Sequence, residues 1–289
     1  MGEHRLDLFR GGTGEPLVLL HGLFESWHAW SPVLERLTAQ RDVLAFTHLG
    51  HAGSPPFEAG QPPTIAGWTD AVEAELDSAR LERSDIAGHS LGGWVAMELA
   101  KRGRAGSVVA VSPAGRYSDG EIDRIVRLMR RNYRMAHWLL PIGRRVVRTR
   151  VGRRILLADS CADPTRIPPD DAERLVVDLA TCSDAEGFLR ALQGQNGEAV
   201  RFDGARSVRC PVLIALPEED RFFTRFHAER YAEELPEARI GVLPDCGHNA
   251  MFDHPELVGS TILSFVAMQR RHLPAGSKTS RNHYPPSSL

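Results

Sequence analysis

The residues best suited to chemistry lie in a glycine-flanked serine turn, Gly88-His89-Ser90-Leu91-Gly92. An apolar stretch precedes this turn and a helix-forming stretch follows it, which predicts a sharp connection between a strand and a helix. Side chains larger than those of Gly88 and Gly92 would clash in so tight a turn. We expect the Ser90 hydroxyl to stand exposed at the N-terminus of the helix, where the helix field favours developing negative charge. A serine placed in this way can act as a nucleophile when a base lies beside it.

Two later segments contain residues that could supply that base and an acid to orient it. His248 follows Gly247 in a loop that comes directly after an apolar strand, and Glu218, Glu219 and Asp220 follow another. A carboxylate that accepts the Nδ1–H of a histidine holds the ring in place and stabilises the imidazolium. The alternative for the acidic cluster is a solvated loop. We assign His248 as general base and expect one of these three acids to orient it.

A fourth segment can stabilise an oxyanion. The pair His21-Gly22 follows an apolar strand and begins a loop, which can aim a backbone N–H at a developing negative charge. We assign this donor to Leu23, with Phe24 as the alternative, and expect the N–H of Leu91 to be its partner. His21 is expected to shape the loop by hydrogen bonding rather than to act as a base.

The elements that must position these residues alternate between short apolar runs and amphipathic stretches. This alternation predicts an α/β fold with a mostly parallel central sheet and helices on both faces. The expected strands are Arg5–Phe9, Leu17–Leu20, Val43–Phe46, Asp85–Ala87, Ser107–Val111, Val212–Ala215 and Arg239–Leu243. The expected helices are Trp30–Thr38, Ile65–Ala79, Leu91–Lys101, Phe226–Glu234 and Pro255–Met268.

The alternation stops between about residues 116 and 206, where the chain suggests helices and loops without a strand. We therefore expect a core formed by residues 1–115 and 207–273, with residues 116–206 inserted as a helical cap. The tail, residues 274–289, is rich in Ser, Pro and Asn and is expected to be disordered.

The expected cap has an unusual charge pattern. From Glu121 to Arg154 it contains eleven arginines and only two acids, and an apolar stripe from Ile122 to Leu140 has helical spacing. We expect the stripe to face inward and to line an apolar acyl pocket. The arginines are interpreted as a solvated outer face, and attraction of anionic substrates or of an anionic membrane surface is the alternative.

Composition bounds the function further. The 289 residues carry a net charge of −2, with 42% hydrophobic and 25% charged residues, which is typical of a globular protein and disfavours a nucleic-acid binder. The first residues lack the apolar segment of a secretory signal, and no apolar run is long enough for a transmembrane segment. The four cysteines are scattered without a C-x-x-C pair, so we expect neither a disulfide framework nor zinc, and a cytoplasmic location.

Taken together, these motifs resemble those of the α/β-hydrolase superfamily. The resemblance runs from about Arg5 to Met268 and includes the triad order Ser-Asp-His, which is the order on this fold. The family's oxyanion loop, nucleophile elbow and histidine loop match the segments quoted above, and the cap falls where the family varies. The family's acid position falls on Asp220. There are two departures: Pro217 replaces the usual Gly before the acid, which keeps Glu219 as the other candidate, and Thr47 replaces an acid that is structural in the family.

The resemblance implies a serine hydrolase that uses Ser90, His248 and Asp220 for acyl transfer to water, without metal or organic cofactor. The expected substrate is a small apolar carboxylic ester, lactone or thioester. Alternatives are C–C bond hydrolysis of a diketone-type substrate, cofactor-free perhydrolase (haloperoxidase-like) activity, and a hydrolase-fold ligand receptor. Family branches that form an alkyl-enzyme, the haloalkane dehalogenases and epoxide hydrolases, have Asp at the Ser90 position, which disfavours them here. The sequence leaves the oligomeric state open.

Overall fold

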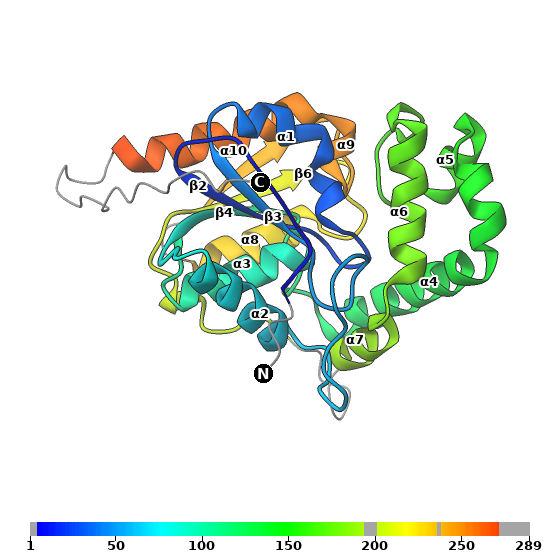
Figure 1. The fold of residues 1–289 in the computed structure, drawn as a ribbon, viewed down its shortest axis with the longest axis horizontal. Coiled ribbons are helices and arrows are strands. Elements are labelled where there is room, and N and C mark those ends of the chain that lie inside the picture. The colour runs from blue at the N-terminus through cyan, green and yellow to red at the C-terminus, as the bar shows by residue number, and fades with distance from the viewer. Residues whose placement is uncertain (1–4, 194–200, 236–237, 272–289) are drawn as a thin grey trace, which may run out of the picture.

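The centre of the protein is a seven-stranded sheet with strand order β1-β3-β2-β4-β5-β6-β7 (Figure 1). The computed structural model describes residues 5–193, 201–235 and 238–271. Only β1 is antiparallel to its neighbour, and the other strand pairs are parallel. The strands are β1 (Leu8–Gly11), β2 (Pro16–Leu20), β3 (Asp42–Phe46), β4 (Ser84–His89), β5 (Ala105–Val111), β6 (Val212–Pro217) and β7 (Ala238–Leu243).

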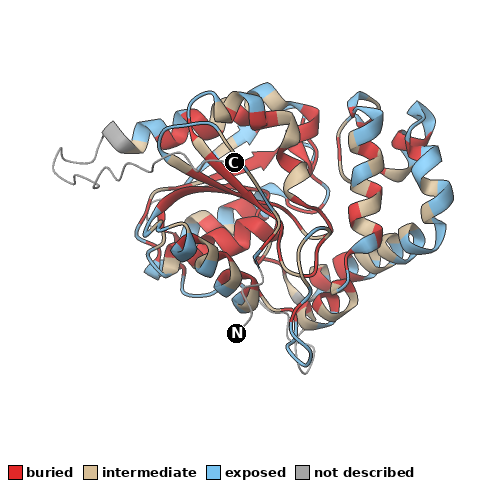
Figure 2. Ribbon diagram, viewed as in Figure 1, coloured by how far each residue is buried: buried red, intermediate tan, exposed pale blue. Residues whose placement is uncertain are grey.

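Helices cover both faces of this sheet, as predicted, and Figure 2 shows the buried strands between them. Side chains alternate along β2, so that Val18 and Leu20 join one core cluster while Leu17 and Leu19 join the other. Such burial on both faces is typical of parallel strands. One face is covered by α2 (Ile65–Ser78), α3 (Leu91–Lys101) and α8 (Arg225–Glu234), and the other by α1 (Ser31–Thr38), α9 (Ala250–Asp253) and α10 (Pro255–Arg271).

Four helices lie between β5 and β6 in the chain: α4 (Asp119–Val147), α5 (Arg150–Leu156), α6 (Pro169–Thr181) and α7 (Ala185–Leu192). We call them the helical insertion, and Figure 1 shows them beside the sheet. Ser118 and Glu121 form a capping box at the start of α4, which satisfies backbone N–H groups of its first turn. The helices α4 and α6 pack together, and Val147 and Val176 join a small apolar cluster that also includes Phe252 of α9.

The predicted fold class is confirmed, and one strand was placed wrongly. The first strand was expected at Arg5–Phe9 but spans Leu8–Gly11. Before this strand, backbone N–H groups bind side chains and not a neighbouring strand. The N–H of Leu6 donates to Glu75, and that of Asp7 donates to Ser54. Among the described residues, no helix is long and apolar enough to cross a membrane. The tail expected to be disordered, residues 274–289, lies outside the described residues.

Candidate active site

The candidate residues come from loops at one edge of the sheet. The strands β2, β4, β5, β6 and β7 are parallel neighbours, so the segments that follow their carboxyl ends meet at the same edge. Ser90 follows β4, Asp220 comes soon after β6, and His248 follows β7. Ligand sites of open α/β sheets lie at this edge.

Ser90 sits in a strained turn between β4 and α3. Its backbone has φ 50° and ψ −112°, a region that a non-glycine residue adopts only when its surroundings enforce it. A Cβ on Gly88 would lie 2.3 Å from the carbonyl oxygen of Gly92, and one on Gly92 would lie 2.2 Å from that of Leu20. Both glycines are therefore required for the turn. The N–H of Ser90 donates to the carbonyl of Val111 at 2.9 Å, which ties the turn to β5.

Asp220 and His248 form a buried pair. The Nδ1 of His248 lies 2.9 Å from Oδ2 of Asp220, while Glu219 is exposed at the surface. The same Oδ2 accepts a 2.6 Å hydrogen bond from the Ser112 hydroxyl, and Oδ1 accepts two backbone N–H groups, from the residues that follow the acid. Each oxygen of this carboxylate thus has two hydrogen-bond partners, which fixes its orientation toward the histidine.

The electrostatics of the pair favour an ion pair when the histidine is protonated. Burial alone would lower the pKa of His248, but the charge and hydrogen bond of Asp220 outweigh burial, so this pKa lies above the ordinary value. Burial alone would raise the pKa of Asp220, but His248, Ser112 and the backbone donors hold it below the ordinary value. Asp220 therefore stays ionised at neutral pH and can stabilise an imidazolium.

The loop after β2 places its backbone against the same site. Gly22, Leu23 and Phe24 line the pocket together with Ser90, and Phe24 has φ 70°, which turns the loop sharply. Within the part of the chain that the structure describes, the N–H groups of Leu23 and Leu91 have no hydrogen-bond partner. Both remain available to a ligand.

His21 supports this loop from behind. Its Nδ1 contacts the carbonyl of Gly22 at 2.6 Å, and its Nε2 accepts the N–H of His48 at 2.9 Å. Burial, followed by the nearby imidazoles of His48 and His51, lowers its pKa well below the ordinary value, so the ring is neutral. These contacts hold His21 behind the loop, where it supports the backbone and does not lie beside Ser90.

The structure also reveals a buried carboxylate that the sequence analysis did not single out. Glu25 accepts the N–H of Gly22 at 2.8 Å, contacts Nδ1 of His89 at 3.1 Å and accepts the side-chain amide of Asn249 at 2.8 Å. The other nitrogen of His89 lies 3.0 Å from the carbonyl oxygen of His248. Burial would raise the pKa of Glu25, but His89 and Gly22 keep it below the ordinary value. This ionised residue joins the oxyanion loop, the serine turn and the histidine loop.

Thr47, where the family usually has an acid, also has a structural explanation. Its hydroxyl donates to Oδ2 of Asp7 at 3.1 Å and accepts the N–H of Trp27 at 3.2 Å. Asp7, which directly precedes β1, therefore supplies a carboxylate beside this position. The departure changes the local support and leaves the serine turn untouched.

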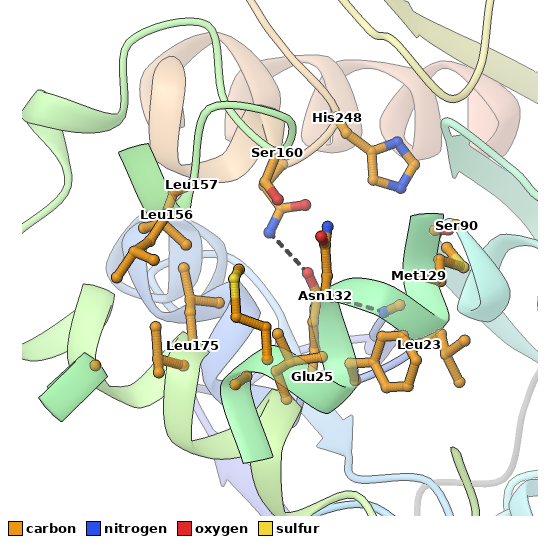
Figure 3. Close-up of a pocket in the computed structure, with 18 of the residues that line it drawn as sticks. Leu23, Glu25, Ser90, Met129, Asn132, Leu156, Leu157, Ser160, Leu175 and His248 are labelled. Atoms are coloured by element: carbon orange, nitrogen blue, oxygen red, sulfur yellow. Dashed lines mark hydrogen bonds between the residues drawn. The ribbon is translucent and has the colours of Figure 1, made fainter. Parts of the chain in front are cut away.

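A cavity of about 310 Å³ opens above these residues, between the sheet edge and the helical insertion. Ser90 and His248 lie on one side of it, and Leu156, Leu157 and Leu175 gather on the other side (Figure 3). Asn132 of α4 and Ser160, which lies between α5 and α6, also line it, and most of the remaining lining is aliphatic. The cavity suits an apolar group attached to a reacting centre at the serine. Among the described residues, no cluster of three or more His, Cys, Asp or Glu suits a metal ion.

The sheet, the strained serine and the Asp-His pair define the class of protein to which this chain belongs. The model of the alpha/beta hydrolase family matches residues 17–260. The chain therefore belongs to the alpha/beta hydrolase family and is a hydrolase, as the resemblance implied.

Similar proteins match large parts of this chain. Epoxide hydrolase EphH of Mycobacterium tuberculosis is 31% identical over 208 residues, which cover 68% of this chain and 92% of that protein. The pimeloyl-[acyl-carrier protein] methyl ester esterase of Aromatoleum aromaticum is 27% identical, covering 83% of this chain and 93% of that protein. The structure of a thermophilic esterase from Thermogutta terrifontis superposes with a TM-score of 0.72 at 22% identity, covering 91% of this chain and 93% of that chain.

Proposed function

We propose that the protein hydrolyses a small carboxylic ester, lactone or thioester through an acyl-enzyme formed on Ser90. The observation that carries this proposal is the 2.9 Å contact between Asp220 and His248 at the wall of the apolar cavity that also exposes Ser90. A nucleophile, a base and an orienting acid are the parts that acyl transfer requires.

The proposed reaction proceeds in two similar halves. His248 removes the hydroxyl proton as Ser90 Oγ attacks the carbonyl carbon, and the N–H groups of Leu23 and Leu91 stabilise the oxyanion. Collapse of this intermediate breaks the bond to the leaving group, which takes the proton from His248. Water then attacks the acyl-enzyme with His248 again as base, and the acid product leaves with Ser90 regenerated.

Epoxide ring opening is the function that the name of one relative suggests. That reaction, as it runs through an alkyl-enzyme, requires a carboxylate at the position that Ser90 occupies, and Glu25 does not supply one. Its two oxygens are engaged by Gly22, His89 and Asn249. Ester cleavage is therefore favoured, and C–C hydrolysis and perhydrolysis remain alternatives because they use the same triad.

A substrate panel tests the proposal directly. p-Nitrophenyl esters of increasing acyl length should turn over continuously, and kcat/KM should rise with length until the chain outgrows the apolar cavity. A lactone, a vinylogous diketone and an epoxide are assayed beside them, and hydrogen peroxide with acetate tests perhydrolysis. Preferred turnover of the epoxide or the diketone would contradict the proposal, and a single slow turnover would favour a receptor.

The pH profile should report the ionisation of His248. The base must be neutral, and Asp220 raises its pKa above the ordinary histidine value, so kcat/KM should increase as pH rises through that raised pKa and then level off. Activity is lost on the acid side because the protonated ring cannot accept the serine proton. The measurement is kcat/KM for a neutral ester between about pH 5 and pH 9, and a flat profile would exclude His248 as the base.

A further inference from the structure

The helical insertion exposes large apolar side chains. Trp138 of α4 is 81% exposed and Ile142 is 61% exposed, while Val151 and Ile155 of α5 are 69% and 70% exposed. The sequence analysis expected a single inward stripe on α4, and this second, exposed set of apolar residues was not anticipated. We call Met135, Trp138, Leu139, Ile142, Val146, Val151 and Ile155 the apolar rim.

The apolar rim is continuous with the cavity. Met135, Leu139, Ile142 and Val146 recur at helical spacing on α4, and all of them also line the cavity above Ser90. The apolar surface thus begins inside the pocket and continues outward to Trp138 in solvent. An apolar surface of this kind at a pocket mouth marks an interaction site rather than a scattered exposed residue.

Eight arginines of the insertion form two groups of four. Arg130 and Arg134 pair with Glu186 on α7, and Arg144 and Arg148 pair with Glu173 on α6. These ion pairs tie the helices together. The arginines that the sequence analysis placed on one solvated face therefore include some that pair with acids of neighbouring helices.

The second group borders the apolar rim. Arg131 and Arg145 each lie seven residues from Trp138 along α4, and Arg150 and Arg154 alternate with the exposed residues of α5. Each of these four is exposed, and within the described part of the chain none has a carboxylate within ion-pair distance. The chain contains no acidic residue from 124 to 158. The border is therefore uniformly positive.

We propose that the apolar rim and its four arginines dock on the surface of an anionic phospholipid bilayer, with the mouth of the cavity facing the lipid. Arginine binds phosphate groups, tryptophan favours the interfacial region, and aliphatic side chains can enter the acyl boundary. An apolar substrate would then reach Ser90 from the bilayer without crossing water. Docking itself requires no reaction at Ser90.

A second copy of the chain is the other conceivable partner. A twofold contact through the same surface would bring the arginine borders of both copies together, and the rim offers no acid to neutralise them. Lipid phosphates provide that neutralisation, which is why the charge pattern favours a bilayer.

The test measures binding of the Ser90→Ala protein, which cannot hydrolyse lipid, to vesicles by co-sedimentation. Vesicles of phosphatidylcholine alone are compared with vesicles that also contain phosphatidylglycerol. We expect binding only to the anionic vesicles, weakening as salt is raised. The fluorescence of Trp138 should shift to the blue on binding, and Trp138→Ala should remove that shift.

Variants identify the surface. Arg131→Glu with Arg145→Glu, and separately Trp138→Ala with Ile155→Ser, should each weaken the binding by about tenfold or more. None of these side chains lines the cavity. When the same changes are made in the protein that keeps Ser90, kcat/KM for a water-soluble ester should therefore stay unchanged. Loss of vesicle binding with normal turnover distinguishes failure of docking from failure of the proposed reaction. The matched controls are Arg206→Glu with Arg209→Glu before β6, and Phe226→Ala on α8, which is 55% exposed.

Three results would overturn the proposal. One is equal loss of binding in the controls and in the rim variants. Another is absence of binding to anionic vesicles at low salt. The third is a dimer in solution that Trp138→Ala dissociates while vesicle binding is absent, which would assign the rim to self-association.

Discussion

Replacing Ser90 with alanine should abolish ester turnover and leave the fold intact. Loss of a triad nucleophile costs about 10⁶ in kcat, and the small residual rate comes from binding and the oxyanion donors. The fold should survive because the serine turn is held by Gly88, Gly92 and the 2.9 Å hydrogen bond from the backbone N–H of Ser90 to Val111. None of these contacts uses the hydroxyl.

A fluorophosphonate probe and thermal unfolding measure the two parts of this prediction. The probe should label the wild-type protein at Ser90 and fail on the variant, whose Tm should match that of wild type. Ser160→Ala is the matched control, because this serine also lines the cavity but has no histidine partner; it should keep both labelling and turnover. Labelling of another serine in Ser90→Ala, at the wild-type rate, would refute the assignment.

The segments of the proposed triad stand out in the sequence because each is local. A strand followed by a serine between two glycines determines the elbow within five residues, and the structure shows that a Cβ on Gly88 or Gly92 would meet backbone. The chain order Ser-Asp-His is read from the residue numbers and is the order on this fold. The choice between Glu219 and Asp220 depends on where the turn after β6 directs each side chain, and adjacent acids in the sequence do not determine that.

The parts that sequence did not predict depend on contacts between distant segments. Glu25 meets His89 and Asn249 across separations of 64 and 224 residues, and no local pattern encodes such a meeting. One signal was present: Glu25 is an acid in a loop that is otherwise apolar or small, directly after His21-Gly22. A carboxylate beside an oxyanion loop is costly to bury unless several donors meet it.

The insertion was predicted as helical but its faces were not. Helical periodicity identified the inward residues of α4, such as Ile122 and Val126, which are buried in the main core. The exposed apolar residues of the rim follow the same periodicity on another side of the helix, so periodicity alone could not separate them from buried ones. Pairing of Arg130 with Glu186 likewise depends on how α7 packs on α4.

Asp220→Asn should reduce kcat by about 10⁴, the loss measured for the corresponding change in another serine triad. In the native protein Oδ2 faces two donors, the Ser112 hydroxyl and the Nδ1–H of His248, and Oδ1 faces two backbone N–H groups. An amide has one oxygen and one NH₂ group. In the variant, the NH₂ group must therefore point at one of these two pairs of hydrogen-bond donors. If the NH₂ group faces His248, the ring is driven to the tautomer with a protonated Nε2, which cannot accept the serine proton. If the NH₂ group faces the backbone, the local loop is destabilised instead.

Glu218→Gln and Glu219→Gln are the matched controls, because both side chains are exposed, and each should change kcat less than about twofold. Stopped assays on a p-nitrophenyl ester, with Tm recorded for every variant, distinguish lost catalysis from lost folding. A severe loss in Glu219→Gln together with a mild one in Asp220→Asn would place the triad acid one residue earlier.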